Sequence, residues 1–377
     1  MSIRRQWQSF DFVLLLMVCG FAVFGVLMVN AAQSYSVLTA SSNTYATQKL
    51  FLGTGLIILA VTAVVDYHFI ARFYWPIYAL MIILLIVVMI VGANDPTNTA
   101  RWIRIGKTFA IQPSEFSKIF IIVFLAKFID KRQDTINNIG VLSILLGLII
   151  VPVILILRQP ALSACMVIAA ISVCAVFSSG LKFKYIIIAV SITAAAAALI
   201  MWDLNNTDRV FIDKILGSYQ ISRIDTFRHT EPNSEAFSQT KASLTSIGSG
   251  MLDGKGYKNG SYIPMGLNDF IFSIIGEQFG FIGCAGVLIV ILLIIGKCIL
   301  IANRAPDMLG RLLAMGIAGK LAFEVLVNVG VATAILPNTG MPFPFLSSGG
   351  SSMWVNMASI GLVLNVGLFK AKSIFKG

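Results

Sequence analysis

Charged residues are scarce in this chain of 377 residues: they make up 12% of it, while hydrophobic residues make up 57%. A soluble domain usually carries about a quarter of its residues as charges. The mean hydropathy of +0.87 is too high for such a domain. The shortage of charge therefore excludes a soluble globular protein and predicts a polytopic membrane protein.

Histidine and cysteine are also rare, with two His and five Cys in the chain. All the cysteines lie in apolar runs and their number is odd, so we interpret them as small buried hydrophobes rather than as a disulfide framework. Neither His68 nor His229 has cysteines or carboxylates at metal-ligand spacing. The sequence therefore shows no structural metal site.

Long apolar runs dominate the rest of the chain. Runs of about 18 or more apolar residues predict membrane-spanning helices. They lie near residues 12–31, 50–65, 75–93, 114–129, 139–157, 161–179, 185–202, 270–298, 312–335 and 351–369. We predict an all-α integral membrane protein of about ten transmembrane helices, forming one polytopic domain over residues 1–377. The run after Arg4 and Arg5 is interpreted as an uncleaved first helix, because further spans follow it.

The formal net charge is +11, but the basic residues cluster in short loops between spans, so we expect no nucleic-acid partner. If the N-terminus is inside, the positive-inside rule places these loops and both termini in the cytoplasm. The outward segments are then residues 32–48, 94–113, 203–268 and 336–350. The longest, 203–268, is predicted as an extracytoplasmic loop between the seventh and eighth spans.

Asp269 is the first candidate for a catalytic residue. It stands where this polar segment meets the apolar Phe270-Ile271-Phe272, and an ionisable residue at that depth is costly to keep unless it has a function. Ser273 and Glu277 follow at helical spacing and share a face with it. The alternative is that Asp269 only caps the helix, which aspartate does well.

The second outward segment contains a basic cluster and a helix start. Arg101 and Arg104 beside Trp102 could bind phosphate, or could serve only as interface anchors. Pro113 suits a first helical turn, with Gln112 or Ser114 as the cap.

Inside that predicted helix, Glu115 and Lys118 are three residues apart on one face. Their alternative interpretation is an ion pair that satisfies only itself. Further along, Lys320 and Glu324 lie four apart in the ninth span and are expected to pair.

The long outward segment contains Gln239, Ser243 and a glycine-rich run around Lys255. The run is one residue short of the Walker spacing and lacks its Ser or Thr, so a nucleotide site is rejected. A tight turn, or an anion-binding nest of backbone amides, remains possible.

Residues 336–352 combine two prolines, Gly349-Gly350 and several serines, including Ser347 and Ser351. Irregular backbone at membrane depth persists only where it is buried or lines a wet cavity. The segment therefore indicates an outward-facing cavity.

These segments together resemble the SEDS family, which comprises the RodA, FtsW and SpoVE proteins. The matching motifs are Ala100–Gly106, Gln112–Lys118, Tyr219-Gln220, Arg223-Ile224, Ile247–Gly250, Gly254–Gly256, Asp269–Phe272, Gly276-Glu277, Phe279-Gly280, Leu336-Pro337, Thr339-Gly340, Pro342, Pro344-Phe345 and Ser347–Ser352. They occur in family order across nearly the whole chain.

The resemblance implies an integral-membrane glycosyltransferase of the bacterial cytoplasmic membrane. Such an enzyme polymerises lipid II, the undecaprenyl-diphosphate-linked disaccharide-pentapeptide. It also implies a class B penicillin-binding protein as the transpeptidase partner, a divalent cation (Mg²⁺ or Mn²⁺) and dependence on the aspartate that aligns with Asp269.

On this hypothesis Asp269 is the general base. Arg101, Arg104 or Lys118 would stabilise the leaving diphosphate, and Glu115 would orient Lys118 or bind the cation together with Asp269. The remaining candidates for substrate contact are Gln112, Gln239, Ser243, Lys255, Ser347 and Ser351.

Three positions depart from the family pattern. Ala161 stands where an aspartate is usual, Met265 where a glutamate is usual, and Ser348 where tyrosine is common. Ala161 keeps open the alternative of a catalytically weak scaffold that activates its transpeptidase. A lipid-linked sugar flippase is the other alternative.

Overall fold

The computed structural model describes residues 10–34, 44–92, 101–105, 109–159, 161–182, 185, 203 and 235–369. The predicted span 185–202 lies outside the described residues except for Tyr185, as do His229 and the motifs at 219–224. Everything below concerns the described part of the chain.

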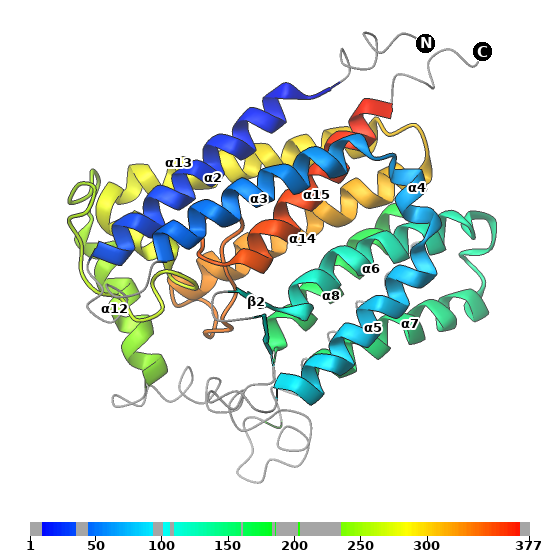
Figure 1. Cartoon of the computed structure of the whole chain (residues 1–377), viewed down its shortest axis with the longest axis horizontal. Helices are drawn as coiled ribbons and strands as arrows, with labels where there is room; N and C mark the ends of the chain where they lie inside the picture. Colours follow the sequence, from blue (N-terminus) through cyan, green and yellow to red (C-terminus); the bar gives the residue numbers. More distant parts are fainter. Residues whose placement is uncertain are drawn as a thin grey trace.

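This part is almost entirely helical (Figure 1). The helices are α2 (Phe12–Ser34), α3 (Thr44–Val64), α4 (Tyr67–Arg72), α5 (Tyr74–Val91), α6 (Pro113–Asp130), α7 (Ile139–Leu157), α8 (Leu162–Ser178), α12 (Glu235–Ser249), α13 (Ile271–Asn303), α14 (Met308–Ala332) and α15 (Gly350–Phe369). A 3₁₀ turn spans Gln133–Thr135, and the strands β1 (Ile103–Ile105) and β2 (Phe109–Ile111) form an antiparallel pair.

Among the described residues, 7 helices are long and apolar enough to cross a membrane. They are α2, α3, α5, α7, α13, α14 and α15, while the apolar α8 is shorter. The all-α, multi-pass membrane fold is thus confirmed, whereas the prediction of about ten spans stays a prediction.

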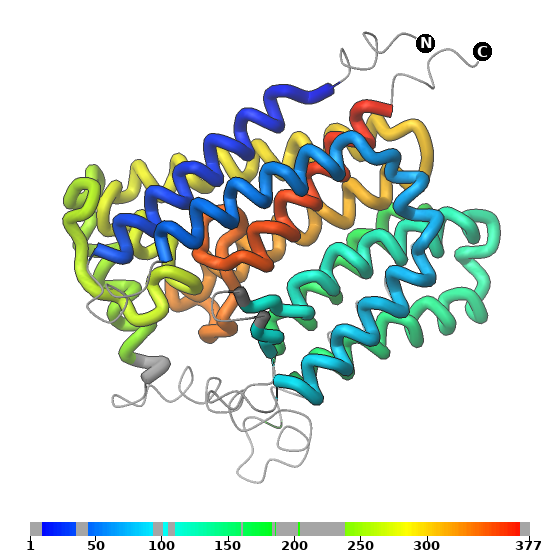
Figure 2. The backbone as a smooth tube through the Cα atoms, viewed as in Figure 1, coloured from blue at the N-terminus to red at the C-terminus, as the bar shows by residue number. Residues whose placement is uncertain are grey.

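Helix α14 lies at the centre, because it packs against α6, α8, α12, α13 and α15. Of its most apolar stretch 67% is buried inside the protein, against 17% for α7. The starts of α2 and α4 and the end of α15 lie toward one end of the bundle, and α12 lies at the other (Figures 1 and 2).

Two features of the fold differ from expectation. The outward segment is not all loop, because α12 forms within it and packs on α13. Helix α13 is also not one straight span: Gly280 adopts φ 61° and ψ −158° and breaks it. A residue with a side chain would be strained in that conformation, so glycine is required there.

His68, for which the sequence shows no cluster at metal-ligand spacing, has two carboxylate partners. Its ring nitrogens lie 2.8 Å from Asp66 and 2.7 Å from Asp307, and the Tyr67 hydroxyl donates to the same Asp307 carboxylate at 2.8 Å. Asp307 also caps α14 through the amide of Gly310. The cluster ties α4 to the start of α14.

Candidate active site

Asp269 is half-buried in the turn that precedes α13. Its backbone carbonyl accepts a hydrogen bond from the side-chain amide of Asn328 at 2.9 Å, and the same amide donates to the Met341 carbonyl at 2.7 Å. The N-cap residue of α13 is Phe270, which makes no side-chain cap bond. The N-cap position of α13 is therefore Phe270 rather than Asp269, and the Asn328 side chain of α14 holds the backbone of the aspartate in place.

The segment before α15 holds the same turn from another side. The Ser347 hydroxyl donates to the Asn268 carbonyl and accepts from the Phe343 amide, and the Ser348 amide donates to Leu267 at 2.8 Å. Ser347, predicted to bind substrate, is buried and supports the Asp269 turn in this structure.

This irregular segment is packed inside the protein, as its depth requires. Phe343 and Phe345 are buried, and the Phe343 ring stacks on Phe272 of α13 with centroids 6.2 Å apart. A Cβ on Gly25 of α2 would overlap the Phe345 carbonyl, so glycine at that position lets the two backbones approach closely.

A chain of buried charges joins three helices nearby. Lys118 of α6 lies 2.6 Å from Glu115 and 2.8 Å from Glu324 of α14. Glu324 also pairs with Lys320 at 3.0 Å, and Lys320 donates to Asn356 of α15. Both predicted pairs, Glu115 with Lys118 and Lys320 with Glu324, are confirmed. The sequence did not indicate that Glu324 joins them.

One carboxylate oxygen in this group of buried charges has no partner within the described residues. Glu115 Oε1 accepts from Lys118, but Glu115 Oε2 is buried and unbonded, as is the neighbouring Ser114 hydroxyl. A buried carboxylate oxygen without a donor is costly. The start of α6 therefore has an acceptor available for a ligand or an ion.

The other predicted residues of the second outward segment lie around this helix start. Gln112 is the N-cap residue of α6 with Pro113 at its first position, as predicted. The backbone amide of Gln112 donates a hydrogen bond to the Ser351 hydroxyl at 3.0 Å. Arg101 donates from Nε to the Gln159 carbonyl at 3.1 Å, while Arg104 is exposed on β1.

Gln239 and Ser243 of α12 are buried and bonded within the protein. Gln239 accepts from Asn338 at 2.9 Å, which ties α12 to the segment before α15. Ser243 lies 2.6 Å from Ser273 of α13 and donates to the Ala332 carbonyl at 2.7 Å. Gln239 therefore holds α12 against the segment before α15, and Ser243 holds it against α13 and the end of α14.

The glycine-rich run completes the hydrogen bonds of the broken helix α13. The break at Gly280 frees the amides of Phe281 and Ile282, which donate instead to Met251 and Leu252 at 2.9 and 3.2 Å. The Glu277 and Gln278 carbonyls in turn accept from the amides of residues 255 and 256, each at 2.9 Å. These two amides and two carbonyls are thereby satisfied.

This exchange leaves no open nest at Gly254, Lys255 and Gly256, whose amides all donate to backbone carbonyls. The run contains glycine because the backbones touch. A Cβ on Gly250 would overlap the carbonyl of Gly276, and one on Gly254 that of Gln278.

Lys255 forms an ion pair with Glu277. The Lys255 ammonium lies 2.6 Å from Glu277, whose side chain is 1% exposed. Glu277 also accepts from the Ser261 amide at 3.0 Å and the Ser261 hydroxyl at 2.9 Å. Glu277 and Ser273 thus both face α12 and the outward segment.

The structure brings together the Asp269 turn, Asn328 and Ser347 in one group and Glu115, Lys118 and Glu324 in another. Sequence reasoning missed Asn328 as the positioning partner of Asp269. A signal for it existed, because Lys320, Glu324 and Asn328 recur every four residues and so line one face of α14.

The fold and this polar interior define a class of multi-pass membrane proteins, and comparisons identify the family. The family model described as the cell cycle protein FtsW/RodA/SpoVE matches residues 11–372. The chain therefore belongs to that family, which is the SEDS family.

Relatives agree over most of their length. The probable peptidoglycan glycosyltransferase FtsW of Trichlorobacter lovleyi is 32% identical, covering 95% of this chain and 93% of that protein. The peptidoglycan glycosyltransferase MrdB of Escherichia coli is 31% identical over 84% of this chain and 83% of its own. A solved chain from a peptidoglycan synthase complex that coordinates polymerisation and crosslinking matches with a TM-score of 0.79 and 24% identity. The match covers 98% of this chain and 99% of that chain, and it shows the fold.

Proposed function

We propose that this protein is a peptidoglycan glycosyltransferase that polymerises lipid II into glycan strands on the outer face of the bacterial cytoplasmic membrane. The observation that carries the proposal is the Asp269 turn, which places a carboxylate where the outward segment meets α13. Asn328 donates to the Asp269 backbone carbonyl, and Ser347 donates to that of Asn268. Family membership and the glycosyltransferase relatives support the assignment.

In the proposed reaction, Asp269 removes the proton from the 4-hydroxyl of the acceptor sugar. That oxygen attacks the anomeric carbon of the lipid-linked sugar with inversion, and undecaprenyl diphosphate leaves with the bonding electron pair. Asn328 is the positioning residue, since its amide holds the Asp269 carbonyl at 2.9 Å.

Positive charge is needed where the diphosphate leaves. Arg101 and Arg104 are on the outward segment and suit that task. Lys118 has a 2% exposed side chain and two carboxylate partners, so its role is to position Glu115 and Glu324 rather than to meet the diphosphate directly.

We also propose that a divalent cation binds at the start of α6. Mg²⁺ is commonly held by one or two carboxylates together with substrate phosphates, and Glu115 Oε2 is a buried carboxylate oxygen with no bond among the described residues. Glu115, with Asp269 as a second candidate ligand, would hold Mg²⁺ or Mn²⁺. The ion would neutralise diphosphate charge.

We further propose a class B penicillin-binding protein as partner and a cytoplasmic location for both termini. The partner is supported by the fold match to a complex of polymerisation and crosslinking. The orientation is supported by the basic loops, since α4, whose last turn contains Arg72, lies at the same end of the bundle as the start of α2 and the end of α15 (Figure 1).

The test is glycan synthesis from lipid II by the purified chain with its transpeptidase and a divalent cation. Asp269→Asn should lower polymer formation by about 10²–10⁴-fold, the usual contribution of a general base. Asp253→Asn, an exposed carboxylate of the same outward segment, should be unaffected. Undiminished product from Asp269→Asn would refute the base. No product from the native chain would favour the scaffold that Ala161 allows.

A further inference from the structure

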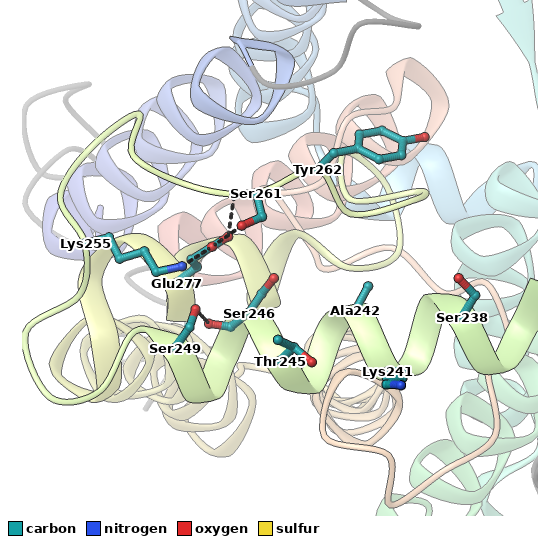
Figure 3. A pocket seen from close by; sticks show the side chains of 10 residues that line it. All are labelled: Ser238, Lys241, Ala242, Thr245, Ser246, Ser249, Lys255, Ser261, Tyr262 and Glu277. Atoms are coloured by element: carbon teal, nitrogen blue, oxygen red, sulfur yellow. Dashed lines mark hydrogen bonds and ion pairs between the residues drawn. The ribbon is translucent and has the colours of Figure 1, made fainter. Parts of the chain in front are cut away.

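A cavity of about 390 Å³ lies at the outer end of the protein, separate from the Asp269 turn. One wall is α12, the opposite wall is the segment around Ser261 and Tyr262, and Glu277 of α13 closes one end (Figure 3). The lining is rich in hydroxyl groups, including those of Ser238, Thr245 and Ser246.

The cavity has a fixed frame. Glu277 is held by Lys255 and by two bonds from Ser261, and the backbone exchange across Gly280 fastens the whole segment to α13. The Tyr257 hydroxyl donates to the Leu27 carbonyl of α2 at 3.1 Å and anchors the far side. A pocket framed this way is largely formed before any ligand arrives.

The two cations of the cavity do not converge. Lys255 lies beside Glu277 at one end, while Lys241 lies further along α12 toward Ser238 (Figure 3). A compact phosphate would call for donors aimed at one point. Lys255 is already neutralised at 2.6 Å but its side chain is 39% exposed, so its remaining N–H donors can reach neutral oxygens.

The lining therefore suits an extended ligand that has many hydroxyl groups and a carboxylate. Serine and threonine hydroxyls both donate and accept, as sugar hydroxyls do. Tyr262 is 48% exposed and offers an apolar ring face beside a polar tip. Lys241 supplies the cation for the carboxylate.

We infer that this cavity is a subsite for the glycan strand already made, whose sugars carry hydroxyl groups and whose peptide stems carry carboxylates. The inference rests on the proposed function. Its location fits, because α12 is joined to α13 one turn beyond Asp269 by Ser243 and Ser273, 2.6 Å apart. A strand held along α12 would keep its reacting end near the transfer site between additions.

Binding of soluble glycan strands with peptide stems to the full chain in detergent tests this subsite without requiring activity. Thr245→Trp fills the cavity, and Lys241→Glu reverses the charge of the lysine at its other end, so each should weaken binding at least several-fold. The matched controls are Leu244→Trp, at an exposed position on the same helix that does not line the cavity, and Lys258→Glu on the facing segment. Both should bind as the native chain does.

Amidating the stem carboxylates should weaken binding to the native chain but not to Lys241→Glu, and inorganic phosphate should not compete. With lipid II as substrate, Thr245→Trp should release shorter strands than Leu244→Trp. Equal binding by Thr245→Trp and Leu244→Trp would overturn the subsite even if Asp269 still proves essential. Site-dependent binding by a chain that makes no polymer would instead refute the proposed function and keep a carbohydrate site.

Discussion

Two lysine–carboxylate pairs in this protein have the same length and opposite surroundings. Lys118–Glu115 and Lys255–Glu277 both measure 2.6 Å, but the lysine side chain is 2% exposed in the first pair and 39% in the second. Distance alone would rank them equal. Burial decides the energetics, because desolvation makes an unpaired charge inside the bundle very costly, whereas water screens one at the surface.

The surroundings also decide what each lysine can do. Lys118 has two carboxylate partners from two helices, and with Glu324 and Lys320 it forms a group of two cations and two anions between α6 and α14. Lys255 has one partner. The buried lysine therefore holds helices together, and the outer lysine keeps donors for a ligand.

The largest effect should come from Lys118→Met. Glu324 would keep Lys320, but Glu115 would be left buried without its cation, which costs about 3–5 kcal/mol. Thermal unfolding in detergent would measure the loss. Adding Glu115→Gln to this variant should restore much of the stability. A double variant no more stable than the single one would contradict the network as described.

An intermediate loss of stability is expected when the backbone segment that holds Lys255 beside Glu277 is disturbed. Gly254 has φ +81° and its Cβ would overlap Gln278, so Gly254→Ala should cost about 2–4 kcal/mol through strain and overpacking. Gly248→Ala is the matched control, since a Cβ there meets nothing within 4 Å. It lies in α12 and should be neutral or stabilising by up to about 1 kcal/mol. Similar melting temperatures for the two variants would show that the segment does not pack tightly on α13.

The smallest effect should come from Lys255→Met. The Glu277 side chain is itself only 1% exposed, but it would retain both bonds from Ser261, whereas Glu115 already has one oxygen without a bond among the described residues. The cost should therefore be about 1–2 kcal/mol, smaller than at Lys118. The same unfolding assay compares it directly with Lys118→Met. Equal losses at the two sites would remove the contrast between them.

Much of the fold could be predicted because its signals are local. Apolar runs of membrane length lie within α2, α5, α7 and α15, and Pro113 marks the first turn of α6. The pairs at spacing three and four, Glu115 with Lys118 and Lys320 with Glu324, follow from helical periodicity alone.

The rest depended on contacts between distant segments. Glu324 reaches Lys118 across 206 residues of sequence, and Asn328 reaches the Asp269 carbonyl across 59. The requirement for glycine at position 280 comes from the 251–256 segment, which accepts and donates the hydrogen bonds that the break in α13 releases. No period in the sequence encodes such pairings.

By itself the sequence determined that this is a membrane protein with a carboxylate at a helix mouth, because hydropathy and spacing are properties of short stretches. Only the tertiary structure decided which groups hold that carboxylate. It also decided that Lys118 is buried between two carboxylates, whereas Lys255 stays partly exposed to solvent. The physical reason is that buried polar groups must find partners, and in a bundle of helices those partners come from whichever segment packing brings within hydrogen-bond reach.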